Sequence, residues 1–202
     1  MPSRLVGLFK TLTWNDFQGT PDPKKPALDA FTHATFALPV VNPVPVPGTK
    51  DFHFDDNVVI TISMDSWKSW KRQANLTSKG TAYANDLLKH EQGHYNIVAL
   101  LARDLFIEIM QLKPNTYPNA SAAIADLRLI IAKFNGKAEK VSIIYDSVNE
   151  TNHGVNSAQQ SKWNLMISKA FTAPRSPAMS APDGTPYKVP FLNVLSQNSI
   201  NP

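Results

Sequence analysis

The sequence predicts an α+β protein in which a small, mostly antiparallel sheet packs on one long helix and two or more further helices follow. Three observations lead to this fold class: alternating apolar residues near the N-terminus, a long proline-free stretch of helix-forming residues in the middle, and the placement of the prolines. Of the 16 prolines, only Pro114 and Pro118 lie between residues 48 and 173. Because proline interrupts helices and central strands, regular structure is expected mainly in that part.

Two segments ahead of the long helix have the composition of strands. Residues 31–38 are rich in Phe and Thr, and residues 58–64 alternate between apolar and hydroxyl-bearing side chains. The second strand could align an extended peptide by edge pairing. Between them, residues 39–47 are rich in proline, which lacks the N–H donor of a central strand. We therefore expect an extended connector or an edge there.

The middle of the chain predicts helices. Residues 83–112 contain no proline and form the longest helix, which Pro114 ends. Three shorter segments follow, at residues 122–134, 140–148 and 157–171. The middle one of these three fits a strand as well as a helix.

The domain organisation follows from the same pattern. We expect one compact domain over residues 1–173 and a proline-rich, loop-like tail over residues 174–202. One apolar segment of the tail, residues 191–195, either docks on the body or is mobile. The tail could also cover the active-site cleft as an inhibitory segment.

Composition and charge exclude several classes of protein. The chain has no cysteine, which rules out a disulfide framework and a thiolate zinc site. Its net charge is +4, but the basic residues are scattered, and Lys68, Lys71 and Arg72 indicate a snorkelling surface segment rather than a nucleic-acid patch. No apolar run approaches the roughly 20 residues that span a bilayer. The apolar run within residues 1–10 is too short for a signal peptide. The sequence leaves the compartment and the oligomeric state undetermined.

Residues 90–94 read His-Glu-Gln-Gly-His, which fits the HExxH pattern of zinc metalloproteases. Helical residues four apart share a face, with Cβ atoms roughly 5–6 Å apart, so His90 and His94 can bind one Zn²⁺ ion. Zinc lowers the pKa of a bound water to about 7, and Glu91 is placed to take a proton from that water as general base. The sequence therefore predicts a zincin-like active-site helix.

The histidines lie within an apolar helical stripe. Its other members are Leu87, Ile97, Leu101 and Leu105. An unpaired imidazole among apolar side chains is costly, so His90 and His94 either bind a metal or are satisfied core histidines. The glutamate between them favours the metal.

A catalytic zinc site typically has three protein ligands and an open position for water. The residues after His94 lack the spacing of the metzincins, so the third ligand comes from elsewhere. The region 145–154 is dense in candidate ligands. We assign His153 as the third ligand, with Asp146 and Glu150 as alternatives. If His153 binds zinc, Asp146 would orient a ligand imidazole by accepting its other N–H.

Three segments carry a further pattern: Leu-x-Trp-x-Asp-Phe-x-Gly near the N-terminus, His-Glu-Gln-x-His with Ile three residues on, and Tyr-Asp followed by Thr-x-His-Gly, Gln and Trp. In this chain they comprise Leu12, Trp14, Asp16, Phe17, Gly19, residues 90–97, Tyr145, Asp146, Thr151, His153, Gly154, Gln160 and Trp163. They resemble a bacterial family of uncharacterised, predicted zinc-dependent proteases, often secreted and catalogued as a domain of unknown function. The resemblance spans about residues 10–172. Asn96 departs from it, since the family often has Asp there.

The residues and the resemblance together predict a zinc metallopeptidase that acts on a protein or peptide substrate. Glu91 would also donate the proton to the leaving amine. Tyr145 would stabilise the oxyanion beside zinc, or is a core tyrosine with a satisfied hydroxyl. The alternative is a non-catalytic, zinc-stabilised binding module for peptide or cell-wall material, whose metal would be closed off by a fourth protein ligand. A zinc hydrolase of non-peptide amides is a third option.

Overall fold

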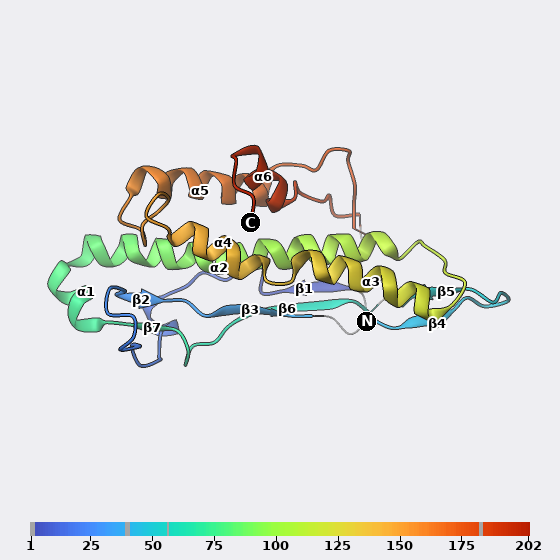
Figure 1. Cartoon of the computed structure of the whole chain (residues 1–202), viewed down its shortest axis with the longest axis horizontal. Helices are drawn as coiled ribbons and strands as arrows, with labels where there is room; N and C mark the ends of the chain where they lie inside the picture. The colour runs from blue at the N-terminus through green and yellow to red at the C-terminus, as the bar shows by residue number, and fades with distance from the viewer. Residues whose placement is uncertain (1–2, 39–40, 56, 182–183) are drawn as a thin grey trace.

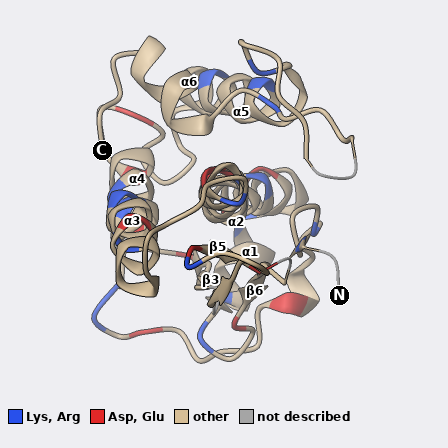
Figure 2. Cartoon of the chain, turned by 90° about the vertical axis from the view of Figure 1, so that its right-hand side faces the viewer, with Lys and Arg blue, Asp and Glu red and all other residues tan. Residues whose placement is uncertain are grey.

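The long helix α2, Thr81–Leu112, forms the centre of the molecule. In the computed structural model, which describes residues 3–38, 41–55, 57–181 and 184–202, the other elements surround this helix (Figure 1). Seen end-on, α2 has the strands on one side, α3 and α4 on a second side, and α5 and α6 on a third (Figure 2). The predicted α+β class is confirmed, and the long helix starts two residues earlier than expected.

The second half of α2 is buried on nearly all sides. Every residue from Ile97 to Ile107 is buried, including a charged pair, Arg103 and Asp104. A helix that is apolar all round needs partners all round, which the sheet and the flanking helices supply. The first half has one buried face only, and that face carries His90 and Glu91.

The main sheet has the strand order β1-β6-β3. β1 (Arg4–Val6) pairs parallel with β6 (Val59–Met64), and β3 (Ala34–Ala37) pairs antiparallel with β6. The sheet is therefore mixed, where a mostly antiparallel one was expected. The prediction that the strand at residues 58–64 offers a free edge is wrong, because β6 is paired on both sides. Within the described residues the two edge strands of this sheet are β1 and β3.

Two small antiparallel ladders flank this sheet. β2 (Ala30–Phe31) pairs with β7 (Trp70–Lys71), and β4 (Pro43–Pro45) pairs with β5 (Phe52–Phe54). The proline-rich stretch thus contributes a short strand with one partner, which agrees with an edge; residues 39–40 of it lie outside the described part. A short helix that the pattern did not indicate, α1 (Gln73–Lys79), leads into α2.

The later helices match their expected positions closely. They are α3 (Ala120–Phe134), α4 (Lys137–Asp146) and α5 (Ser157–Thr172). The ambiguous middle segment is therefore a helix. Asn119 caps α3 by accepting a hydrogen bond from the backbone N–H of Ala122, which satisfies one free donor of its first turn.

The tail is part of the fold. It contains α6 (Phe191–Gln197), and Phe191, Val194 and Leu195 of this helix are fully buried against the body. The backbone N–H of Phe191 donates to Asp104 Oδ2 at 2.5 Å. Arg103 donates to the carbonyl oxygen of Val189, so the buried charged pair of α2 holds the tail. A separate loop-like tail from residue 174 is therefore not what the structure has.

The tail also lies away from the predicted cleft. α6 packs on α5 and α2 (Figure 2), while the groove described below is lined by residues of β3, α3 and α4. An inhibitory tail over the cleft is thus not seen in this arrangement. The role of residues 191–195 is to close the core on the α5 side.

Leu195→Ala is expected to lower the free energy of unfolding by about 2–5 kcal/mol, because it empties a fully buried site in the core. Urea unfolding monitored by circular dichroism measures this change. The matched control is Leu165→Ala on α5, where the leucine is largely exposed and a change within about 0.5 kcal/mol is expected. Equal effects of the two substitutions would show that α6 does not stabilise the body.

The basic segment before α1 has an internal structural role. Lys71 Nζ donates to the carbonyl oxygens of Trp14 and Phe17. Arg72 donates to the carbonyl oxygens of Asp22 and Leu28. These side chains hold the N-terminal segment against β7.

Among the described residues, none of the helices combines the length and the apolar character needed to span a membrane.

Candidate metal centre

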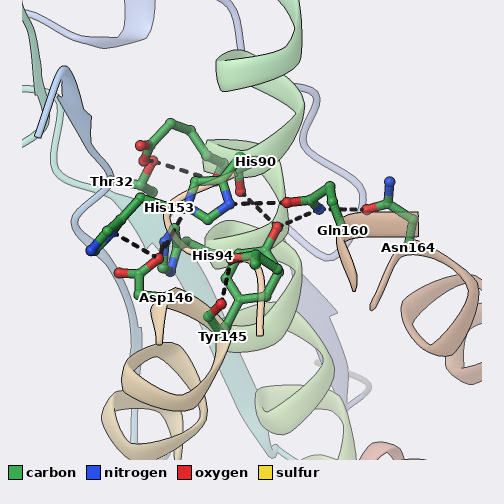
Figure 3. A network of polar contacts seen from close by, with 10 residues as sticks. Thr32, His90, His94, Tyr145, Asp146, His153, Gln160 and Asn164 are labelled. Carbon is green, nitrogen blue, oxygen red and sulfur yellow. Dashed lines mark hydrogen bonds and ion pairs between the residues drawn. The ribbon is translucent and has the colours of Figure 1, made fainter. Parts of the chain in front are cut away.

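Three side chains from two helices meet in one group that could hold a metal ion. His90 and His94 come from α2, and Asp146 is the last residue of α4. Asp146 Oδ1 lies 3.0 Å from His90 Nε2 and 3.0 Å from His94 Nε2 (Figure 3). One donor atom from each residue lies within 4.8 Å of the others, and among the described residues this is the group with that property.

The local structure explains why these three residues meet. His90 and His94 are four residues apart on α2, so both imidazoles leave the same face of the helix. Helix α4 packs along α2 and ends at Asp146, and the chain then turns away at Ser147. The carboxylate therefore points from the end of α4 onto the histidine face (Figure 3).

The electrostatics of the group show a carboxylate that stays charged. Burial alone would raise the pKa of Asp146, but hydrogen bonds from His90 and His94 hold the pKa of this carboxyl well below its usual range. Burial alone would lower the pKa of His94; the hydrogen bond to Asp146 and the charges of Asp146 and Glu91 raise it instead. A negative site with two imidazoles attracts a cation.

A hydrogen-bond chain fixes the orientation of His90. Gln160 on α5 donates from Nε2 to the hydroxyl of Tyr145 at 2.7 Å and to Asn164 Oδ1 at 2.9 Å. Both amide protons are therefore engaged, and Gln160 Oε1 faces His90 Nδ1 at 3.0 Å. Nδ1 must carry the proton for this contact, so Nε2, which faces Asp146 and His94, is the nitrogen that can bind a metal once it gives up its own proton.

Tyr145 supports His90 and does not face the metal group's open side. Its ring stacks on the His90 ring with a centroid distance of 4.7 Å and an interplanar angle of 7°. The tyrosine is fully buried, and its hydroxyl donates to the carbonyl oxygen of His90 at 3.2 Å while accepting from Gln160. Burial raises the pKa of Tyr145. Of its two predicted roles, the structure places it in that of a core tyrosine with a satisfied hydroxyl.

The glycine of the His-Glu-Gln-Gly-His motif makes room for this tyrosine. A Cβ atom at Gly93 would lie 2.2 Å from the Tyr145 hydroxyl oxygen, so any larger residue would displace the ring. Gly154 is similar: its φ is +82°, and a Cβ there would lie 3.0 Å from the Cβ of His90. The turn after α4 therefore packs directly over His90.

Glu91 is buried next to the group. Its side chain is only 3% exposed, and Thr32, between β2 and β3, donates from Oγ1 to Glu91 Oε2 at 2.7 Å. Glu91 lines a small pocket of about 150 Å³ together with His90, His94 and Asp146. A carboxylate held in this way is oriented toward whatever occupies the pocket.

The other predicted ligands lie farther out. His153 sits in the turn after α4 with a φ of +51°, and its Nδ1 lies 3.5 Å from Asp146 Oδ1. Its side chain is 46% exposed, and it is not part of the three-residue group. Glu150 accepts a hydrogen bond from the indole of Trp163 at 2.9 Å and does not join the group either. Of the three candidates for the third ligand, the structure therefore places Asp146 beside His90 and His94.

An open groove of about 1410 Å³ runs away from the metal group. His94 and Val98 of α2 line it, β3 contributes Phe36 on one side, and α3 and α4 contribute Phe134 and Ile143 on the other. Because β3 has a free edge, the groove has unpaired backbone groups along one wall.

The fold and the His90–His94–Asp146 group together define an α+β protein with a potential metal-binding site. A family model described as bacterial protein of unknown function (DUF922) matches residues 53–154, just over half of the 202 residues, and the chain belongs to this family. The bacterial family of unknown function that the motifs resemble is thereby confirmed. The match contains the metal group, but Thr32 and Gln160 lie outside it. No curated protein and no solved structure matches the chain.

Proposed function

We propose that the protein is a zinc-dependent metallopeptidase in which Glu91 is the general base. The observation that carries this proposal is the meeting of His90 Nε2, His94 Nε2 and Asp146 Oδ1 beside the buried carboxylate of Glu91, at the end of an open groove. A group with only a structural role would not need this groove or this carboxylate.

The donor set fits zinc. Two imidazole nitrogens and one carboxylate oxygen are ligands that Zn²⁺ takes in catalytic sites, where a fourth position stays open. The hydrogen bond from His90 Nδ1 to Gln160 presents the correct nitrogen to a metal. When bound, Zn²⁺ would supply Lewis-acid activation of a water molecule and of the substrate carbonyl.

The residues of the chain would divide the remaining work. Glu91 takes the proton of the attacking water and delivers it to the leaving amine. Thr32 holds one oxygen of Glu91, so the carboxylate keeps its orientation through both proton transfers. Tyr145 and Gln160 keep the His90 imidazole in place. Tyr145 acts here as a positioning residue and does not touch the substrate.

The groove suits an extended peptide. The free edge of β3 can add a peptide as a further strand, so main-chain hydrogen bonds would hold the substrate regardless of its sequence. The apolar side chains of Val98, Phe134 and Ile143 would then receive substrate side chains. This arrangement transfers the peptide-aligning role from β6, which is paired on both sides, to β3.

One observation favours the alternative, a zinc-stabilised binding module for peptide or cell-wall material. His153 lies 3.5 Å from Asp146, so a small rotation would make it a fourth protein ligand and close the site. Against this stands Glu91, because a closed structural site has no use for a buried carboxylate oriented by Thr32.

A peptide-hydrolysis assay with zinc-loaded protein tests the proposal. We expect a mixture of unstructured peptides to be cleaved, cleavage to stop when a chelator removes the metal, and activity to return when Zn²⁺ is restored. The absence of hydrolysis by protein that retains one tightly bound Zn²⁺ per chain would support the binding module instead.

Gln160→Leu is expected to weaken zinc binding by about 10–100-fold, because His90 loses the acceptor that fixes its tautomer and ring orientation. Competition with a chromophoric chelator measures the affinity. The matched control is Gln159→Leu, the same change one position earlier on α5, where the side chain leaves the helix about 100° around from that of Gln160 and the affinity should be unchanged. Similar affinities of the two variants would contradict the role given to Gln160.

A further inference from the structure

The groove has few charged side chains, and they are divided between its two ends. Among the described residues that line it, those with a full charge at neutral pH are Lys24, Lys25, Glu139 and Asp146. The Asp146 carboxylate is engaged by His90 and His94. The charges that a ligand meets are therefore those of two lysines and one glutamate.

Lys25 lies at the end of the groove that holds the metal group. Its ammonium nitrogen is 3.8 Å from the centroid of the Phe31 ring, which is a cation–π contact. Phe31 directly precedes Thr32, whose hydroxyl holds Glu91, and it lines both the groove and the small pocket beside the metal group. This contact places a positive charge where the two hollows join.

The loop that carries both lysines is held in place by Arg72. The guanidinium donates to the carbonyl oxygens of Asp22 at 3.0 Å, Lys25 at 3.2 Å and Leu28 at 2.8 Å. Within the loop, the backbone N–H of Lys25 donates to Asp22, and that of Leu28 donates to Lys25. The Asp22 carboxylate accepts from the backbone N–H of Lys24 at 2.8 Å. The two lysine side chains therefore start from a fixed backbone.

Neither lysine is neutralised within the part of the chain that the structure describes. The described ion pairs include neither the Lys24 nor the Lys25 ammonium group, and both side chains are exposed. Lys79, beside the small pocket, differs because its ammonium group is paired with buried Asp29. Each ammonium group of the loop carries three N–H donors, so Lys24 and Lys25 can both donate to an anion in the groove.

The negative charge lies farther along the groove. Glu139 is in the first turn of α4 and Asp146 is its last residue, so the two are about 10 Å apart along the helix axis. In Figure 1, α4 leads from α3 towards the end of the molecule that holds β2. An acidic ligand group is repelled by Glu139 and attracted by the two lysines. Because about three residues of an extended peptide cover 10 Å, this charge pattern favours an acidic side chain close to the metal group.

We propose that the groove selects peptides with an aspartate or glutamate beside the bond to be cleaved, and that Lys25, together with Lys24, recognises this side chain. The inference rests on the proposed peptidase function and names its substrate class. The selection acts through charge, because solvent-exposed ammonium groups attract a carboxylate without fixing one geometry. Salt screens such an attraction.

The test uses one peptide that zinc-loaded protein cleaves, synthesised with Glu, Gln or Lys in turn at each of the two positions on either side of the cleaved bond. We expect Glu to raise kcat/KM roughly fivefold over Gln at one of these positions, the upper range for an exposed ion pair, and Lys to lower it. The preference for Glu should shrink as the salt concentration rises.

Equal rates for the Glu and Gln peptides at every position, or higher rates with Lys, would overturn the inference while leaving a peptidase. A preference for Glu that does not change with salt would also overturn it, because exposed charges are screened. If no peptide is cleaved by zinc-loaded protein, the proposed function fails and this inference with it.

Substitutions at Lys25 separate recognition from structure. The readout is the ratio of kcat/KM for the Glu and Gln peptides, which a general loss of activity does not change. Lys25→Arg should keep this ratio, Lys25→Met should bring it close to one, and Lys25→Glu should make the Lys peptide the best substrate. Lys162→Met, at an exposed lysine of α5, is the control and should keep the wild-type ratio. A wild-type ratio in Lys25→Glu, or the same change in Lys162→Met, would remove Lys25 from substrate recognition.

Discussion

Glu91→Gln is expected to lower kcat/KM for peptide hydrolysis by about 10²–10⁴-fold, the usual contribution of a general base. The amide keeps the size of the side chain and can still accept from Thr32 through its oxygen, but it cannot take a proton from water. Because Glu91 is not among the three grouped donors, the zinc content should stay at the wild-type level. Rates on a cleaved peptide, normalised to bound zinc, measure the effect.

The control for this substitution is Glu108→Gln on the same helix. Glu108 pairs with Lys133 on α3, far along α2 from the metal group, so the loss of its charge should leave the rate unchanged. A Glu91→Gln protein that binds zinc and keeps its activity would remove Glu91 from the mechanism. A Glu91→Gln protein that loses zinc would instead make Glu91 part of the metal site.

Asp146→Asn is expected to reduce zinc affinity by more than about 100-fold. Loss of a residue that only hydrogen-bonds to a metal ligand typically costs about 10–100-fold, and Asp146 is itself a proposed ligand. The substitution removes the charged donor that lies 3.0 Å from both imidazoles. It also removes the charge that raises the pKa of His94, so His94 would be neutral over a wider pH range. Weaker zinc binding despite more neutral histidine would therefore point to the lost carboxylate ligand.

Parallel measurements on His153→Ala and Glu150→Gln decide between the candidate third ligands. With Asp146 as the ligand, His153→Ala should change zinc affinity little, because this side chain lies outside the three-residue group. Glu150→Gln should leave zinc affinity unchanged, since Glu150 contacts Trp163. If His153→Ala loses the metal and Asp146→Asn keeps it, the assignment of His153 from the sequence is correct and the one from the geometry is not.

The sequence predicts the part of the site that depends on local spacing. His90, Glu91 and His94 lie on one helix, and a helical repeat is enough to place them together. The third residue is different. Three candidate ligands lie between residues 145 and 154, and which of them faces α2 depends on where α4 ends and how it packs, which is tertiary information. Sequence alone therefore offers Asp146 only as an alternative to His153.

Thr32 and Gln160 show the same limit more sharply. Thr32 lies between two short strands, and Gln160 lies on α5, 70 residues from His90. Single threonines and glutamines have no spacing that marks them as partners of a metal ligand. The Gln160 position does recur in the family pattern, which was the available signal, but its contact with His90 Nδ1 needed the fold.

Long-range pairing also explains the errors in the fold. β6 looked like a strand with a free edge because its parallel partner β1 is three residues long and about 55 residues away in sequence. The tail looked separate because α6 is short and lies among prolines. Its attachment depends on Arg103 and Asp104, two charged residues inside a helix that is otherwise apolar there. The sequence of β6 gives no sign of β1, and the sequence of the tail gives no sign of Arg103 and Asp104.

The central claim is a zinc ion held by His90, His94 and Asp146, and anomalous X-ray scattering from zinc-soaked crystals tests it most directly. Data collected on either side of the zinc absorption edge should give one strong peak per chain, within about 2.0–2.2 Å of His90 Nε2, His94 Nε2 and an oxygen of Asp146. A peak at His33 or His53 instead, or no peak between α2 and the end of α4, would contradict the account. His90 and His94 would then be core histidines that bind no metal.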